Sequence, residues 1–200
     1  MFDGGTAIAC GRDFMTKETI TVSCWGYMDN WGEYSGKRMI SCTEGGGWNF
    51  EPSGDSAEKG MNFAIGTGIT SNSYLSATSS IMCKELKPGW HMFSGTYDGL
   101  TAKIYIDGKF YGQSKTLTEK TPIYYNANNG VFIGAEAGGS LTSPASGYFK
   151  GKISDVRVYC TCLNEEELLN LYQTQFSFNN ENELYAYEFT EAAKNNIKIK

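Results

Sequence analysis

The chain lacks several features that would point directly to chemistry. Its 200 residues include one histidine, His91, and no apolar run approaches the roughly 18 residues that span a membrane. The net charge is −5 with no basic block, which excludes the charge footprint of a nucleic-acid-binding protein. No Gly-x-Ser-x-Gly motif and no metal-ligand triad is present. Hydrolysis by an activated serine or by a bound metal ion is therefore not expected.

The N-terminal residues and the cysteines bear on the compartment in which the chain folds. The first residues, MFDGGTAIAC, lack the charged and apolar segments of a signal peptide, so none is visible. A chain of this length can build a core without disulfides, and Cys24 continues the apolar alternation of Ile20 and Val22. We expect free thiols and synthesis in a reducing cytoplasm. The six cysteines are Cys10, Cys24, Cys42, Cys83, Cys160 and Cys162.

The most informative stretch is Trp90–Gln113, which has the pattern of consecutive strands joined by glycine turns. Aromatic residues and threonine lead to Tyr97, and Asp98-Gly99 then breaks the first strand. Apolar and polar residues alternate over 102–106, as in a half-buried strand. Asp107-Gly108 supplies the two positive-φ positions of a type I′ turn. This pattern predicts antiparallel β-hairpins.

Further strands and one helix are predicted on either side of this stretch. Asn164 and Glu167 form a capping-box pattern, and Leu168, Leu171 and Tyr172 share one face, which predicts a helix over 164–173. Residues 71–80 are polar and indicate an exposed loop or an edge strand. Strand patterns occur at residues 2–10, 18–28, 38–43, 61–66, 130–135, 149–159 and 183–189.

Three ordered segments carry a family resemblance. The central one runs from Trp90-His91 to the Ile-Tyr-Ile-Asp-Gly-Lys run ending at Lys109, and it is flanked by 19–27 and 147–172. In this order they resemble laminin-G-like domains of the concanavalin A-like lectin/glucanase superfamily. The resemblance covers about residues 1–175 and implies an all-β, antiparallel two-sheet jelly roll with one short C-terminal helix. Residues 176–200 are predicted to be an extension with one strand, for assembly into homo-oligomers or for linkage.

Two function classes follow from the resemblance. Glycosidases of the superfamily carry a Glu-x-Asp-x-x-Glu run, which this sequence lacks, so a non-catalytic protein is expected. One interpretation is a structural or adhesion component of a phage virion. The alternative is a carbohydrate-binding module of a bacterial surface or secreted protein. The expected partners are accordingly glycans or other virion or surface proteins, at a virion or cell surface.

Candidate site residues were chosen by their chemistry and their position in loops. A glycan is bound by aromatic faces on the concave face or rim. Trp31 and Tyr34 have no apolar periodicity around them, which favours exposure, whereas for Trp48 packing in a sheet is favoured over a role in binding. The ligand-binding candidates are Trp31, Tyr34, Trp48, Tyr74, Tyr124 and Tyr125.

A calcium ion is a further expectation from the resemblance. Members of the superfamily often hold one Ca²⁺ with carboxylates and backbone carbonyls, the oxygen ligands this ion prefers. Asp155 stands where the closing strand of such domains carries an aspartate. Asp3 would lie near it if the terminal strands pair, and Glu44 before three glycines is a third candidate.

Overall fold

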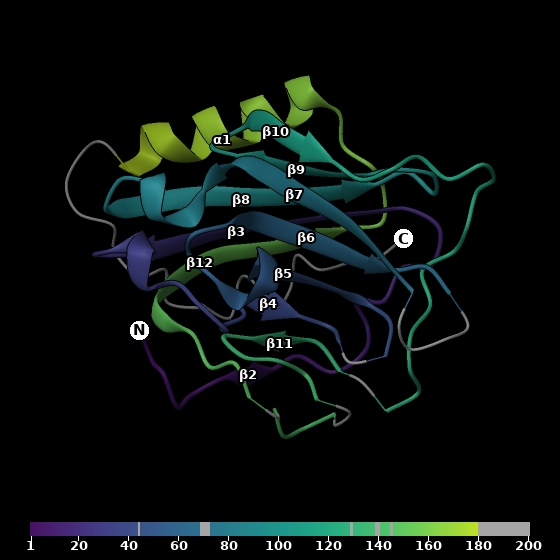
Figure 1. The fold of residues 1–200 in the computed structure, drawn as a ribbon, viewed down its shortest axis with the longest axis horizontal. Helices are drawn as coiled ribbons and strands as arrows, with labels where there is room; N and C mark the ends of the chain where they lie inside the picture. The colour runs from purple at the N-terminus through teal and green to yellow at the C-terminus, as the bar shows by residue number, and fades with distance from the viewer. Residues whose placement is uncertain (44, 69–72, 129, 139–140, 145, 180–200) are drawn as a thin grey trace.

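The computed structural model describes residues 1–43, 45–68, 73–128, 130–138, 141–144 and 146–179. The described chain forms two antiparallel six-stranded sheets and one α-helix (Figure 1). The predicted strand over 183–189 lies outside the described residues. No helix in the described part is both long and apolar enough to cross a membrane.

The first sheet has the strand order β1-β12-β3-β8-β9-β10. Its strands are Phe2–Asp3 (β1), Lys150–Tyr159 (β12), Ile20–Met28 (β3), Gly89–Tyr97 (β8), Ala102–Ile106 (β9) and Lys109–Gln113 (β10). The second sheet has the order β2-β11-β4-β5-β6-β7. Its strands are Ile8–Ala9 (β2), Phe132–Ile133 (β11), Ile40–Ser41 (β4), Trp48–Pro52 (β5), Gly60–Gly66 (β6) and Tyr74–Met82 (β7). The all-β, two-sheet jelly roll predicted from the sequence is confirmed.

The hairpins predicted in Trp90–Gln113 are confirmed. β8 pairs with β9 and β9 with β10, all antiparallel. Asp107 and Gly108 have φ values of 53° and 73°, as the type I′ turn requires. Residues 2–10 differ from the prediction, because they form two short strands that lie in different sheets.

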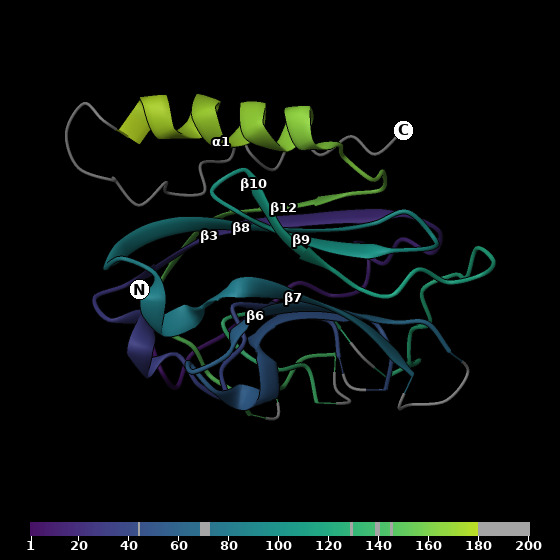
Figure 2. The ribbon, with the colours of Figure 1, turned by 45° about the horizontal axis from the view of Figure 1, so that its top comes forward.

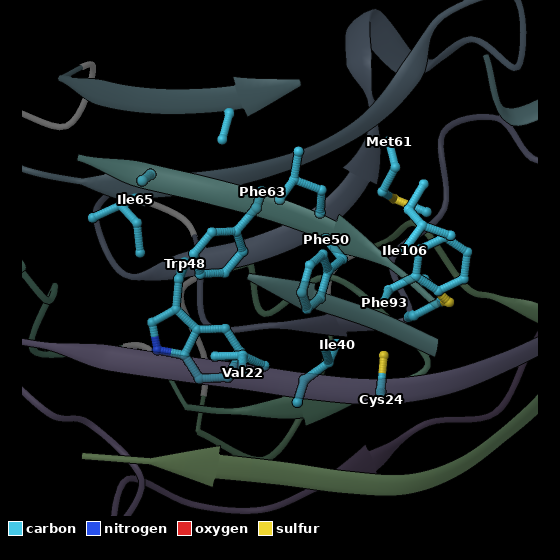
Figure 3. Packing of buried hydrophobic residues seen from close by; sticks show 14 of the residues in the cluster. Val22, Cys24, Ile40, Trp48, Phe50, Met61, Phe63, Ile65, Phe93 and Ile106 are labelled. Atoms are coloured by element: carbon cyan, nitrogen blue, oxygen red, sulfur yellow. The ribbon is translucent and has the colours of Figure 1, made fainter. Parts of the chain in front are cut away.

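The core lies between the sheets and is built from the inward positions of each strand. Val22 and Cys24 of β3 point inward, toward the aromatic rings of β5 and β6 (Figure 3), and Ile20 belongs to the same buried cluster. Gly95 lies where an added Cβ would come within 2.3 Å of the Phe63 ring, so only glycine leaves room for this ring. Burial of these apolar side chains is the main stabilising term in such a sandwich.

Helix α1 covers the outer face of the first sheet. It runs from Glu165 to Asn179 and is therefore longer than the predicted 164–173. Asn164 and Glu167 form the predicted reciprocal capping bonds, at 3.0 and 2.8 Å. Leu168 is fully buried, and the Tyr172 ring stacks on Trp25 at 5.6 Å. The domain thus has a helix, a sheet and a second sheet as successive layers (Figure 2).

The single histidine should make folding stability depend on pH. His91 Nδ1 lies 2.7 Å from Asp107 Oδ2. Burial acts to lower the pKa of His91, but the hydrogen bond and the charge of Asp107, together with the bond to the Lys87 carbonyl, outweigh it and the pKa is raised. The stabilisation is therefore fully present below the unfolded pKa of about 6.5 and is lost as pH rises through the folded pKa. We expect urea midpoints to fall between about pH 6 and pH 8. His91→Gln should flatten this change, and an unaltered profile in that variant would refute the assignment.

The thiols should differ sharply in reactivity. All six cysteines are free thiols in the structure. Burial raises the pKa of Cys24, Cys42 and Cys83 to about 12, whereas Cys160 is exposed. Because the thiolate is the nucleophile, a thiol reagent near neutral pH should react rapidly at Cys160 and not at these three. All six should react in denaturant. Fewer than six groups there would instead indicate a disulfide.

Candidate ligand-binding site

Three of the aromatic ligand-binding candidates are core residues. Trp31, Tyr34 and Trp48 are only 1%, 0% and 0% exposed, so the expectation that Trp31 and Tyr34 are exposed is wrong. The physical reason is a 3-10 turn at Trp31–Glu33, capped by Asn30, that turns the loop back into the core. There the Trp31 ring makes edge contacts with Tyr34, His91 and Phe93.

The other three aromatic candidates lie at or near the surface. Tyr124 and Tyr125 are half-buried, and the Tyr125 hydroxyl donates to the Thr16 carbonyl at 2.6 Å. Tyr74 is 36% exposed on the edge strand β7, and its hydroxyl bonds to the backbone of Gly46. Of the six candidates, Tyr74 lines a hollow in the surface of the described part of the chain.

This hollow lies on the outer face of the second sheet and has a volume of about 170 Å³. Its floor is made by the outward positions of β5 and β6, where Asn49 pairs with Ala64 and Glu51 with Asn62. The inward positions on these strands, such as Phe50 and Phe63, belong to the core. The polar hollow, as we name it, is lined by Arg38, Thr43, Asn49, Glu51, Ala64, Tyr74 and Glu136.

Arg38 is the centre of the polar hollow. Its Nη2 lies 2.5 Å from Glu51 Oε2 and 3.6 Å from Glu136 Oε1, and its Nη1 lies 2.9 Å from Asp55 Oδ1. Burial raises the pKa of Glu51, and the Arg38 charge opposes that rise. A buried guanidinium surrounded by carboxylates holds them in fixed positions, because its planar donors are directional.

Amide groups extend this polar surface. Asn49 Nδ2 donates to Glu51 Oε2 at 3.3 Å, and Asn62 Nδ2 donates to Glu51 Oε1 at 3.4 Å. Within the described residues, Asn49 Oδ1 and Arg38 Nε have no hydrogen-bond partner although both are buried. One is an acceptor and the other a donor, and a hydroxyl group can satisfy either role. Unpartnered buried polar groups are costly, so each calls for a bound water, ion or ligand, or for strain in the packing.

Most residues of the polar hollow were missed from sequence alone. Arg38, Asn49, Glu51 and Glu136 are not among the ligand-binding candidates selected from the sequence. A signal was available in β5, where polar Asn49 and Glu51 alternate with Trp48 and Phe50. Glu136 could not be found this way, because it reaches the hollow from a long loop that is distant in sequence.

The calcium candidates are not brought together in the part of the chain that the structure describes. β1 pairs with β12 as expected, but Asp3 lies opposite Lys150, about 16 Å of strand away from Asp155. Asp155 sits in a β-bulge at φ 47° and bonds to Arg157. Asp3 accepts bonds from Gly5 and Thr6. Glu44 lies outside the described residues.

Asp3 and Asp155 are therefore too far apart to coordinate one Ca²⁺ together. No group of three or more His, Cys, Asp or Glu side chains suited to a metal occurs among the residues with described positions. The calcium expectation stays a prediction, and no metal enters the binding geometry described above.

A larger cavity of about 440 Å³ lies on the outer face of the first sheet, beside the start of α1. Its lining includes the outward positions of β8 and β9 and the first turn of the helix. Burial raises the pKa of Tyr105 to about 12, so this phenol stays neutral there. The lining residues are Thr96, Lys103, Tyr105, Cys162, Leu163, Asn164, Glu165 and Glu166.

Comparison with known proteins places this architecture in a family. The model for the concanavalin A-like lectin/glucanases superfamily matches residues 2–169. The chain belongs to this superfamily. The resemblance read from the three sequence segments is therefore confirmed. No curated protein sequence matches the chain.

Solved structures show the same fold at low sequence identity. Domain 4 of AbnA, an extracellular arabinanase from Geobacillus stearothermophilus solved with arabinotriose, has a TM-score of 0.59 at 15% identity, covering 86% of this chain and 74% of its own. The heptameric SAP-like pentraxin from Limulus polyphemus has a TM-score of 0.55 at 15% identity, with 86% and 79% covered. The botulinum neurotoxin serotype D/C binding domain has a TM-score of 0.50 at 16% identity, with 78% and 36% covered. At such identities the likeness shows the lectin-like fold alone.

Proposed function

We propose that this domain is a non-catalytic glycan-binding module whose ligand occupies the polar hollow. The observation that carries the proposal is the combination of buried amide, guanidinium and carboxylate groups with an unpartnered acceptor, Asn49 Oδ1, and an unpartnered donor, Arg38 Nε. Sugar hydroxyls both donate and accept, so they complement such a surface. Tyr74 at the rim adds an aromatic ring against which a sugar can pack. The arabinotriose complex of the structurally similar AbnA domain supports this choice of ligand class.

The geometry around Arg38 argues against glycoside hydrolysis. A glycosidase places two carboxylates on either side of the scissile bond, with space between them for the sugar or for water. Here Arg38 Nη2 contacts both Glu51 and Glu136 and so occupies the space between these carboxylates. We expect no release of reducing sugar from any oligosaccharide that the domain binds.

Binding at the polar hollow can be tested with one variant and a matched control. A glycan array on the wild-type protein identifies a ligand, and calorimetry then gives its affinity. Asn49→Ala should weaken this affinity about tenfold, because a bound polar group loses its partner at a cost of about 1–3 kcal/mol. Asn170→Ala, an exposed position on α1, should leave it unchanged. Binding that survives Asn49→Ala intact would refute the site, and no binding on the array would refute the function.

A finer proposal concerns where the module works. We propose a structural or adhesion component of a phage virion, with a bacterial surface or secreted protein as the alternative. The six free thiols support folding in a reducing cytoplasm, where phage particles are assembled. Antibodies against the chain should label purified particles. Failure to label them, with glycan binding intact, would favour the alternative.

Assembly through the C-terminal residues is a separate part of this proposal. Residues 176–200 were predicted to mediate homo-oligomers, and helix α1 continues to Asn179. Truncation after residue 179 preserves this helix. We expect the truncated chain to form smaller oligomers than the full chain, as measured by light scattering. Equal states would contradict a role for the tail in self-association. Calcium is tested in the same samples by adding a chelator.

A further inference from the structure

We infer that the polar hollow selects its glycan by charge, preferring amino sugars to neutral sugars and rejecting uronic and sialic acids. This inference rests on the proposed function and on the ionic groups that form the hollow. It names the class of sugar, which neither the fold nor the similar structures decide.

The first step is the charge balance. Arg38 contributes one positive charge, and the lining carboxylates of Glu51 and Glu136 contribute two negative charges, which leaves a net charge of −1. The third carboxylate on Arg38, Asp55, is 59% exposed and lies outside the lining. The side chains of Arg38, Glu51 and Glu136 are 10%, 20% and 15% exposed, so water screens their charges less than at an open surface. A ligand in the hollow therefore meets a negative field.

The second step is that Arg38 is already engaged. Its two terminal nitrogens contact the three carboxylates, and only Nε lacks a partner in the described part of the chain. A bidentate arginine–carboxylate pair needs two parallel N–H donors. Arg38 therefore cannot offer that arrangement to a sugar carboxylate without giving up an internal partner.

The third step is that the rest of the lining does not supply a compensating cation. Apart from Arg38, the lining residues are Thr43, Asn49, Ala64, Tyr74 and the two glutamates. A ligand carboxylate would face Glu51 and Glu136 with no free guanidinium or ammonium group among these residues. An ammonium group on the sugar would instead face two carboxylates that it can pair with. Repulsion between a ligand carboxylate and the two glutamates disfavours acidic sugars, and many binding sites achieve specificity by such repulsion.

The test uses matched sets of sugars that differ only in charge. Oligosaccharides of glucose, glucosamine and glucuronate, with parallel galactose and mannose sets, are titrated at fixed ionic strength. The amino member of the best-binding set should bind at least tenfold more tightly than the uronate member. Glu136→Gln should reduce this ratio at least threefold, since it removes one negative charge and keeps a similar shape. Glu166→Gln is the control, because it removes the same charge at the cavity beside α1 on the opposite side of the domain.

The outcomes separate this inference from the proposed function. Uronates that bind as tightly as amino sugars would overturn charge selection while glycan binding stands. Equal changes in Glu136→Gln and Glu166→Gln would also overturn it, because the preference would then reflect the overall charge of the protein. If no sugar in any set binds at millimolar concentration, the proposed function itself fails. Circular dichroism of each variant checks that the fold is retained.

Discussion

Replacing Trp31 by alanine is expected to lower the free energy of unfolding by about 3–5 kcal/mol, the range for truncating a buried tryptophan. The Trp31 ring is 1% exposed and lies against Tyr34, His91 and Phe93. Its indole nitrogen donates to the Gly89 carbonyl at 3.3 Å. Alanine would leave a cavity and a carbonyl without its donor. Urea unfolding of the purified variant measures the loss directly.

Trp90→Ala is the matched control for this prediction. Trp90 is half-buried and contacts Tyr27 from the surface side of β8, so its truncation should cost less. Both variants remove a tryptophan side chain from the same domain, Trp31 from a 3-10 turn and Trp90 from strand β8. A Trp31→Ala variant as stable as wild type would contradict the core position of Trp31. A loss of stability with unchanged glycan affinity per folded molecule would confirm that Trp31 does not contact ligand.

Replacing Arg38 by alanine is expected to cost about 3 kcal/mol at neutral pH, near the lower end of the effect of breaking a buried ion pair. The variant leaves Glu51 and Glu136 without their shared cation. Because burial already raises the pKa of Glu51, its carboxylate is disfavoured in the folded state. The lower end of the range applies because the Glu51 side chain remains 20% exposed to water.

The pH dependence of this variant gives a second readout. A carboxyl whose folded pKa is raised stabilises the fold below its unfolded pKa, and this stabilisation is lost as pH rises through the folded value. The deficit of Arg38→Ala should therefore be smaller near pH 4 than near pH 7. Arg157→Ala is the control, because the Asp155–Arg157 pair is 31% and 41% exposed and such pairs contribute about 0–1 kcal/mol. Equal losses in both arginine variants would contradict a buried network at Arg38.

The fold could be predicted from sequence because its signals are local. The Asp107-Gly108 turn, the alternation in β9 and the capping box of α1 each depend on residues close together in the chain. The backbone conformations and hydrogen bonds that these residues favour depend on their neighbours in the chain and not on distant segments. The order of strands within each sheet was not predicted, since pairing of distant strands leaves little trace in a single sequence.

The candidate site was harder to predict because it depends on contacts between distant segments. Trp31 lies in a glycine-rich loop that looks exposed, and only the 3-10 turn after Asn30 directs its ring inward. Arg38 and Glu136 are far apart in sequence and meet only in the folded domain. Alternation at Asn49 and Glu51 shows which positions face outward, but it does not show which charges will face one another.

The most direct test of glycan binding at the polar hollow is a nuclear magnetic resonance titration. The ¹⁵N-labelled protein is titrated with the best sugar from the array, and side-chain amide signals are followed. The account predicts shifts at the Asn49 and Asn62 side-chain amides and at the backbone amides of Glu51 and Ala64, which form the floor of the hollow. Shifts centred instead on Thr96, Lys103 and Leu163, beside the start of α1, would contradict it.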